Sequence, residues 1–255
     1  DAFSGKVRLV FQPGEEIGKG AKPFVAAGVL DGAVRVFGLH TAYDLEAGTV
    51  GLKPGINNAA VDHFRIRVHG KSTHVSTPHL GVDALYIASQ IVVAVQGLVT
   101  RRTSPTEPVI IGIGKLNAGT TYNAVAAFAE MEGTTRTISQ ESRDRVRAQV
   151  SETAQSIAAL YGGTAEIEWT DFAAALVNDP QVCEEAAQVV DELLGEGHVV
   201  TDRELSLSGD NFAEFERYKP GAYAYLGTGN PDLPHTMITN HNGGFDVDEN
   251  ALVTG

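Results

Sequence analysis

The feature that most constrains the fold is a change of pattern at residues 60–170, inside a chain that otherwise alternates strands with helices. Phe64, Ile66 and Val68 alternate with Arg65 and Arg67, which predicts a strand with one face on a core. A helix, two strands, a second helix and a last alternating strand are then predicted, around residues 85–99, 109–113, 125–131, 146–157 and 165–169. The order β-α-β-β-α-β predicts a ferredoxin-like α+β unit.

The flanking segments predict an α/β domain built from both ends of the chain. Before the insertion we expect a strand at Val7–Phe11, a helix within Gly18–Leu30 and a strand at Val34–Leu39 that ends at His40. After it we expect helices and strands in alternation, at Asp179–Leu194, His198–Thr201, Asn211–Arg217 and Ala222–Leu226. The predicted domains are therefore 1–58 plus 172–255, incomplete at both ends, and an inserted domain at 59–171.

Composition excludes several partners. The formal net charge of −13 argues against nucleic acid and anionic membranes, because both attract basic surfaces. The most apolar stretch, Ile87–Val99, is interrupted by Gln90 and Gln96, so we expect no membrane span of ~18 residues. A single cysteine excludes an internal disulfide framework, and together with the lack of a leader pattern it predicts a cytoplasmic protein.

Four residues of the predicted α/β domain are candidates for metal chemistry. Glu15 and Glu16 follow a predicted strand, where one carboxylate can ligate a metal while its neighbour accepts a proton from water. An acidic pair is also common in the first turn of a helix, which leaves both readings open. His40 ends a predicted strand, and His241 lies in a loop rich in turn residues with His235 as a competitor. Spacing alone does not show that they converge.

The inserted domain adds candidates for substrate contacts. His74 and His79 share a loop bounded by glycine and proline, which suits an anion or oxyanion contact as well as it suits a polar connection. Asn123 and Arg136 flank the predicted strand at 125–131, and an arginine there could bind a carboxylate bidentately. Cys183 shares the apolar side of its helix with aliphatic residues, so we predict that it packs in the core.

Taken in order, these segments resemble the metal-dependent aminoacylases, a family that includes hippurate hydrolases and indoleacetyl-amino-acid hydrolases. The matching segments span nearly the whole chain: Phe11-Gln-Pro-Gly-Glu-Glu16, Gly38-Leu-His40, Gly70-Lys-Ser-Thr-His74, Pro78-His79-Leu-Gly-Val-Asp83, Gly119-Thr-Thr-Tyr-Asn123, Gly133-Thr-Thr-Arg-Thr137, Pro220-Gly221, Leu226-Gly-Thr-Gly-Asn-Pro231, and His241 before Phe245-Asp246. Their common order makes the resemblance far more specific than any one of them.

The resemblance implies an open-sheet, dinuclear-metallopeptidase-like catalytic domain and an inserted lid that also dimerises. It implies hydrolysis of N-acyl amino acids or related small amides with two divalent metals, zinc or manganese before cobalt or nickel. Glu15 would be the general base, and the metal ligands would include Glu16, His40 and His241. His74 would stabilise the tetrahedral oxyanion, often from the partner subunit. Asn123 and Arg136 would hold the substrate carboxylate, and His79 is a further candidate for substrate binding.

The sequence departs from this family in three places. The family's His-x-Cys-Gly-His-Asp segment is absent, Asn123-Ala-Val-Ala126 replaces Asn-Val-Ile-Pro, and Gly209-Asp-Asn-Phe212 replaces Gly-Glu-Asp-Phe. We therefore expect the chain by itself to bind metal weakly and to be inactive. The alternatives are a catalytically incompetent homologue or fragment that keeps the fold and dimer interface, and a mononuclear iron oxygenase using Glu16, His40 and His241. The α/β order disfavours the second.

Overall fold

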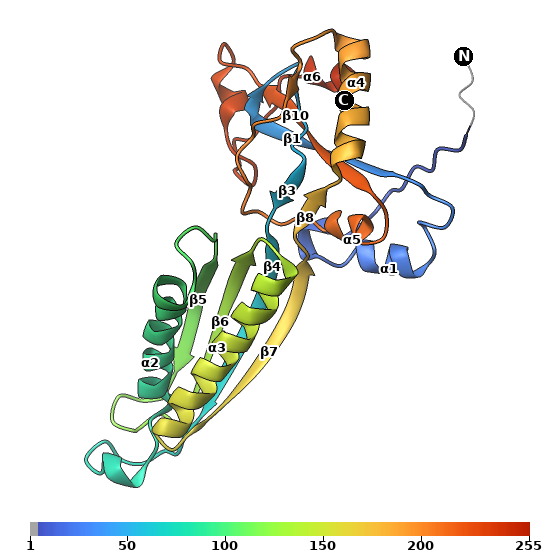
Figure 1. Cartoon of the computed structure of the whole chain (residues 1–255). Helices are drawn as coiled ribbons and strands as arrows, with labels where there is room; N and C mark the ends of the chain where they lie inside the picture. The colour runs from blue at the N-terminus through green and yellow to red at the C-terminus, as the bar shows by residue number, and fades with distance from the viewer. Residues whose placement is uncertain (1–4) are drawn as a thin grey trace. The chain divides into compact units, whose positions relative to one another are not determined.

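The computed structural model describes residues 5–255 and divides them into two compact units (Figure 1). The discontinuous unit comprises residues up to 57, 176–206 and 210–255, and the inserted unit comprises 58–175 with 207–209. The sequence did not predict that residues 207–209 belong to the inserted unit.

The inserted unit is the predicted β-α-β-β-α-β arrangement. Its elements are β4 (Ala60–His69), η2 (Pro78–Leu80), α2 (Ala84–Gly97), η3 (Leu98–Arg102), β5 (Ile110–Ala118), β6 (Phe128–Thr137), α3 (Gln140–Leu160) and β7 (Thr164–Ala173). The four strands form one antiparallel sheet in the order β5-β6-β4-β7. This strand order and the two helices confirm the ferredoxin-like prediction.

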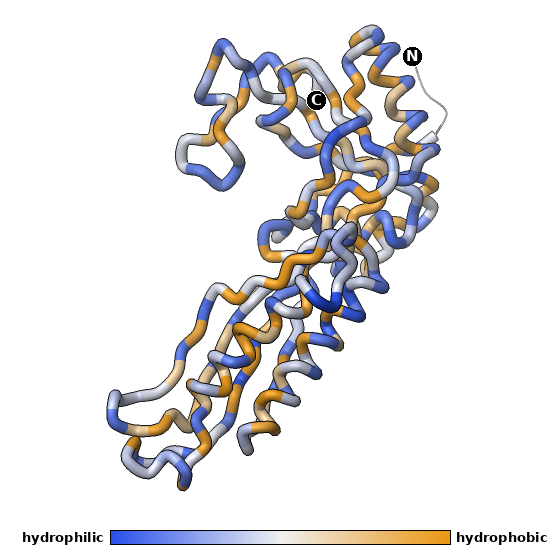
Figure 2. The backbone as a smooth tube through the Cα atoms, turned by 60° about the vertical axis from the view of Figure 1, so that its left-hand side comes forward, coloured by the Kyte–Doolittle hydropathy of each residue, from blue (hydrophilic) through white to orange (hydrophobic). Residues whose placement is uncertain are grey.

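The core of the inserted unit lies between its helices and one face of this sheet. The inward side chains of β4, Phe64, Ile66 and Val68, are fully buried, whereas Arg65 and Arg67 face the other side. Figure 2 shows the same alternation of apolar and polar residues along the strands. Gly133 in β6 is required here, because a Cβ at that position would lie 2.2 Å from the Phe64 ring.

Helix α2 and its extension η3 meet the length and composition of a membrane span, with a mean hydropathy of 1.3 over Ala84–Arg102. This corrects the expectation drawn from the interrupting glutamines. The core helix of a soluble protein passes the same test, and α2 buries Ile87, Ile91 and Val95 completely against the unit's core. The apolar character of α2 is therefore used in packing.

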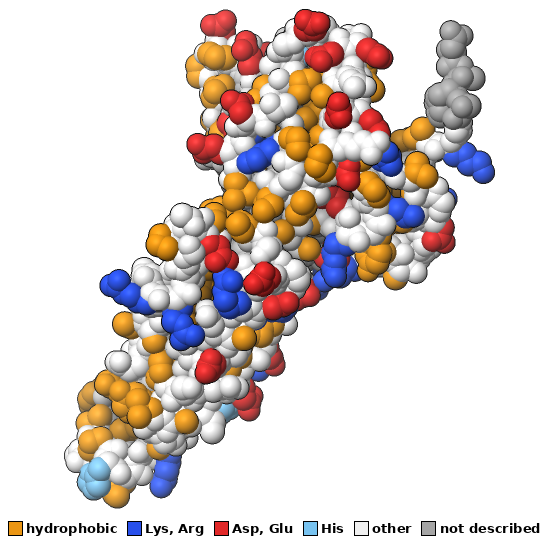
Figure 3. All heavy atoms as spheres, viewed as in Figure 1, with side chains coloured by type: hydrophobic (Ala, Val, Ile, Leu, Met, Phe, Trp, Pro, Cys, Tyr) orange, Lys and Arg blue, Asp and Glu red, His pale blue; other side chains and the backbone are white. Residues whose placement is uncertain are grey.

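The discontinuous unit is built on a mixed sheet in the order β1-β10-β2-β9. Its elements are η1 (Glu15–Ile17), α1 (Ala21–Ala26), β1 (Val36–Glu46), β2 (Val50–Gly51), β3 (Gly55–Asn58), β8 (Leu176–Asn178), α4 (Pro180–Leu194), β9 (Val199–Val200), α5 (Ala213–Glu216), β10 (Gly221–Gly229), η4 (Pro234–Met237) and α6 (Ala251–Thr254). Every residue of β10 is buried, and α4 packs Val182 and Cys183 against it. The predicted core position of Cys183 is confirmed. Acidic side chains are spread over the face of this unit that Figure 3 shows.

Two predicted strands differ from the structure. Val7–Phe11 forms no strand, and Val7, Leu9 and Phe11 are 68%, 75% and 85% exposed. A strand needs a neighbour for its backbone N–H and C=O groups, and no described strand pairs with this segment. His40 does not end its strand either, because β1 continues to Glu46 and pairs with β10 beyond it.

Candidate metal and substrate site

The two adjacent carboxylates of η1 have different partners. Gly14 and Gly18 flank this short helix with positive φ of 72° and 65°, conformations that favour glycine. Glu15 accepts a hydrogen bond from the Asn211 backbone N–H at 3.4 Å. Glu16 is 75% exposed, and its Oε2 lies 3.7 Å from His241 Nε2. The two adjacent glutamates therefore point in different directions: Glu15 inward and Glu16 outward.

The surroundings of Glu15 favour its protonated form. Partial burial is the main cause that raises the pKa of this carboxyl, and the charges of Asp210 and Glu16 raise it further. The hydrogen bond from Asn211 and the charge of His40 act in the opposite direction. Glu15 thus lies where it interacts with both His40 and Glu16, in a setting that increases its affinity for a proton.

Asp210 lies close to this site although the sequence did not predict it as a site residue. It is 8% exposed, accepts a hydrogen bond from the Phe212 backbone N–H at 2.7 Å and accepts another from the Tyr223 hydroxyl. Burial, together with this carboxylate, raises the pKa of the Tyr223 hydroxyl. The motif Gly209-Asp-Asn-Phe212 carried the signal, because it stands where the resembled family has an acidic pair.

His40 is held in one tautomer. Its Nδ1 lies 2.7 Å from the Thr41 carbonyl oxygen, which only accepts, so Nδ1 carries the proton and Nε2 keeps a free lone pair. A histidine that binds a metal commonly donates its other ring N–H to a carbonyl in this way. The ring lies beside those of Tyr223 and Tyr225, at centroid distances of 6.2 and 6.1 Å.

The candidate metal ligands are of the right chemical type for a divalent metal, but the structure does not bring enough of them together. Carboxylate oxygen and imidazole nitrogen are common ligands of zinc and manganese. Glu16 and His241 are adjacent, and His241 adopts a positive φ of 61°, rare outside glycine, that presents its ring from the loop. Within residues 5–255, however, no three His, Cys, Asp or Glu side chains gather into one metal-binding group. The structure thus does not bring the three predicted ligands together into one metal-binding group; they are Glu16, His40 and His241.

His74 and Asn123 lie together at one end of the inserted unit's sheet. His74 forms a β-bridge with Ala124, and the Val75 N–H donates to the Asn123 carbonyl oxygen at 3.1 Å. The Ser76 backbone N–H donates to His74 Nδ1 at 3.2 Å, which places the imidazole proton on Nε2. The exposed His74 ring therefore presents a donor. His79, in η2 of the same loop, is also exposed.

Arg136 lies at the other end of that sheet. Phe128, the first residue of β6, pairs with His69 next to the His74 loop, whereas Arg136 pairs with Val61. At ~3.3 Å per residue, eight residues of β6 separate these two ends by roughly 26 Å. One chain therefore cannot bring Asn123 and Arg136 to the same small carboxylate.

The Arg136 guanidinium has no acidic partner among residues 5–255. Its Nε donates to the Leu207 carbonyl oxygen at 3.0 Å, and one terminal nitrogen donates to Thr134 Oγ1 and the Thr135 carbonyl oxygen. All three partners are neutral, and partial burial lowers the pKa of the guanidinium. An arginine held in place without a counter-charge is suited to an anionic ligand.

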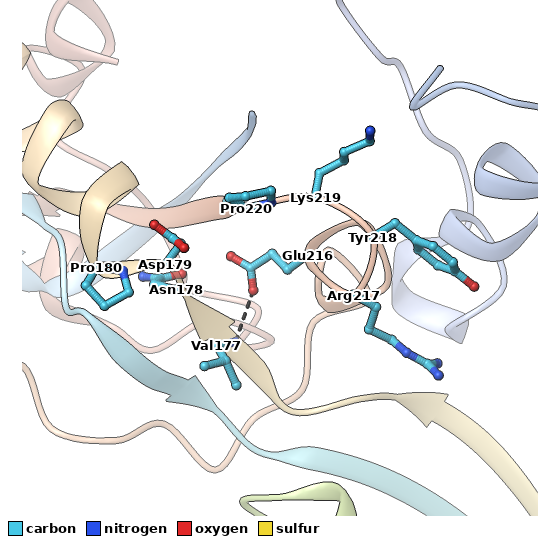
Figure 4. A pocket seen from close by; sticks show the side chains of 10 residues that line it. Val177, Asn178, Asp179, Pro180, Glu216, Arg217, Tyr218, Lys219 and Pro220 are labelled. Atoms are coloured by element: carbon cyan, nitrogen blue, oxygen red, sulfur yellow. Dashed lines mark hydrogen bonds between the residues drawn. The ribbon is translucent and has the colours of Figure 1, made fainter. Parts of the chain in front are cut away.

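A hollow of about 450 Å³ in the discontinuous unit contains none of the predicted site residues (Figure 4). It is lined by residues 177–180 and 216–221. Glu216 accepts a hydrogen bond from the Val177 N–H at 3.0 Å, and its Oε1 is buried without a hydrogen-bond partner among residues 5–255. Burial is the main cause that raises the pKa of Glu216 to about 7, and the charges of Asp210 and Asp179 add to it.

We expect the stability of the discontinuous unit to fall as pH rises through about 7, the pKa of folded Glu216. Folding raises this pKa, so the folded state binds the proton more tightly. The stabilisation is fully present below the ordinary glutamate pKa of ~4.3 and is lost above the folded value, by on the order of 2–3 kcal/mol. Urea unfolding at pH 5 and pH 8 measures the difference. Glu216→Gln should reduce it, whereas Glu184→Gln, an exposed α4 control, should not. Equal pH dependence in all three proteins contradicts the assignment.

The fold and site define a class of protein: an α/β unit with carboxylate and histidine donors, carrying an inserted ferredoxin-like unit. The chain belongs to Peptidase family M20/M25/M40, which it matches over residues 1–255. This is a family of hydrolases, and its α/β fold is the one expected from the sequence.

Relatives and solved structures support the assignment. The chain is 36% identical to an N-acetyl-L-cysteine deacetylase of Bacillus subtilis over 99% of its own length and 59% of that protein. It is 35% identical to thermostable carboxypeptidase 1 of Saccharolobus solfataricus, covering all of this chain and 64% of that protein. A dinuclear metal binding peptidase of this family from Bacillus subtilis superposes with a TM-score of 0.78 at 33% identity, over 96% of this chain and 60% of the other. The chain thus spans less than two thirds of the relatives it matches.

Proposed function

We propose that the protein hydrolyses the amide bond of N-acyl amino acids or related small amides, using two divalent metal ions. The observation that carries the proposal is the different environment of the two η1 carboxylates. Glu15 is half-buried and accepts a hydrogen bond from the Asn211 N–H, whereas Glu16 lies outward beside His241. A general base and a metal ligand need these two environments.

Glu16, His40 and His241 would contribute ligands to the metal pair, for which zinc or manganese suits the oxygen and nitrogen donors best. When bound, the metals would polarise the substrate carbonyl and increase the acidity of water at neutral pH. The free lone pair of His40 Nε2 and the 3.7 Å approach of Glu16 to His241 support these roles.

The remaining steps use groups of the chain itself. Glu15 takes a proton from the attacking water and passes it to the amine that leaves. Arg136 pairs with the carboxylate of the amino acid through its uncompensated guanidinium. His74 donates its Nε2–H to the oxygen that becomes negative in the tetrahedral intermediate.

We further propose that His74 and Asn123 serve the site of a second copy of the chain. They lie at the opposite end of the inserted unit's sheet from Arg136, so one small substrate meets both ends only if two chains contribute. The inserted unit would then be the lid and the dimerisation unit. Asn123 would join the partner's Arg136 in binding the carboxylate, and His79 would lie beside His74.

Mixing two inactive variants tests the function and the dimer together. We expect the protein, as its gene encodes it and loaded with zinc or manganese, to hydrolyse N-acetyl or N-benzoyl amino acids. Glu15→Gln and His74→Ala should each be inactive, and their mixture should recover partial activity, because a hybrid dimer holds one site with both groups. Released amino acid is measured after exchange of subunits has been demonstrated by fluorescence energy transfer between differently labelled chains.

A mixture of Glu15→Gln with Glu16→Gln is the matched control, since both changes affect the same site and should give no recovery. Recovery in neither mixture, with exchange demonstrated, would contradict the contribution of His74 from the partner. A metal-loaded wild-type protein that hydrolyses no N-acyl amino acid would instead favour an incompetent homologue. One observation favours that alternative: within residues 5–255, no three His, Cys, Asp or Glu side chains form a metal-binding group.

A further inference from the structure

His241 lies in a long loop between β10 and α6, which we call the His241 loop and define as residues 231–247 (Figure 1). Apart from η4 the backbone of this loop is irregular, and the His241 side chain is 76% exposed. An exposed loop makes few packing contacts, so the hydrogen bonds that close it have a large effect on where its side chains lie. The position of His241 therefore depends on how the loop is closed.

Asp248 closes the His241 loop at the end of β10. Its backbone N–H donates to the Thr228 carbonyl oxygen at 3.0 Å. Its Oδ2 accepts a hydrogen bond from Asn230 Nδ2 at 2.7 Å. Its Oδ1 accepts two more, from the Asn250 backbone N–H at 3.0 Å and from Asn250 Nδ2 at 2.8 Å. Because Asp248 is only 4% exposed and both carboxylate oxygens accept hydrogen bonds, it is placed to join the ends of the loop.

The two halves of the His241 loop are held differently. Thr236 fixes the first half, since it is fully buried and its Oγ1 accepts a hydrogen bond from the Asn230 backbone N–H at 2.8 Å. In the second half, residues 238–247, the hydrogen bonds that the structure describes join near neighbours in the sequence. The half that carries His241 is therefore tied to β10 through Asp248.

We propose that Asp248 is a positioning residue for metal binding, which holds His241 beside Glu16 by closing the loop. The inference rests on the proposed function, in which His241 is a metal ligand. A ligand on an open loop must give up its conformational freedom when the metal binds, and this entropy cost weakens binding. Without the Asp248 carboxylate, the amide of Asn230 loses its acceptor and the ends of the loop are free to separate.

The test measures the affinity for zinc by calorimetric titration of the protein as its gene encodes it, after its metal has been removed. Asp248→Ala should weaken zinc binding by roughly 10–100-fold, the usual cost of losing a group that orients a metal ligand. Asp246→Ala is the matched control, because this carboxylate belongs to the same loop but is 62% exposed. It should leave the affinity unchanged.

Exchanging the two paired side chains tests whether their hydrogen bond is the cause. Asn230→Asp alone sets two carboxylates against each other and should weaken zinc binding as Asp248→Ala does. The double variant Asn230→Asp with Asp248→Asn restores an amide opposite a carboxylate and should recover most of the affinity. Lack of recovery would overturn this pairing as the device that positions His241.

Hydrogen exchange separates an opened loop from an unfolded unit. Amides of residues 238–247 should exchange faster in Asp248→Ala, whereas those of β10 should stay protected. Asp248→Asn keeps the shape of the side chain and replaces the alanine variant if that variant does not fold. Zinc binding that is tight in the wild-type protein and unaffected by any of these changes overturns the inference alone. A wild-type protein that binds no zinc would overturn the proposed function as well.

Discussion

Replacing Glu15 by glutamine is expected to lower turnover by about a hundredfold or more while metal remains bound. Glutamine has nearly the same shape and keeps an oxygen that can accept the hydrogen bond from Asn211 N–H. It cannot accept a proton, and a positioned general base contributes on this scale. Turnover of an N-acyl amino acid and metal content by atomic absorption are the two measurements.

Glu16→Gln is the matched comparison, because the two residues are adjacent in the same short helix. Its outward carboxylate faces His241, so this variant should lose metal and with it activity. Metal loss of equal size in both variants would show that the two carboxylates share the ligand role. Full activity in Glu15→Gln would remove it from the mechanism.

Removal of Asp62 is expected to destabilise the inserted unit by about 3–5 kcal/mol, because the buried Arg143 guanidinium loses the carboxylate that binds it twice and keeps a weaker acidic neighbour, Asp171, 3.7 Å away and 43% exposed. Asp62 and Arg143 are 1% and 4% exposed, and the guanidinium binds both carboxylate oxygens, at 2.9 and 2.5 Å. Arg147 lies 3.8 Å from the same carboxylate. Asp62→Ala should therefore unfold at much lower urea concentration.

Trp169 makes this measurement specific to the inserted unit. Its ring is partly buried, packs against the same core and lies 5.2 Å from that of Phe64, so its fluorescence follows unfolding of this unit. Lys115→Ala is the control, since its ion pair with Glu132 is 2.7 Å long but the lysine is 56% exposed. Exposed pairs contribute about 0–1 kcal/mol. A loss below about 1 kcal/mol in Asp62→Ala would contradict this expectation and show that Asp171 or water replaces Asp62 beside Arg143.

Much of the inserted unit could be predicted from the sequence by itself. The alternation of Phe64, Ile66 and Val68 with arginines is a local pattern that admits a strand with one buried face. The same holds for the start of α4, where Asp179 accepts hydrogen bonds from the backbone N–H groups of Gln181 and Val182. Both features depend on residues that are close in sequence, so they can be predicted without knowledge of distant contacts.

Only the tertiary structure decided what depends on distant pairing. Val7–Phe11 has the composition of a strand but forms none, because strand formation also requires a partner for its backbone groups. Glu15 and Glu16 are equivalent in sequence, and they differ because Asn211 and His241 approach them from about two hundred residues away. Asn123 and Arg136 form one predicted pair, yet the antiparallel register of β6 and β4 places them at opposite ends of a sheet. Periodicity specifies the conformation of a segment, whereas the surroundings of its side chains follow from which segments pack together.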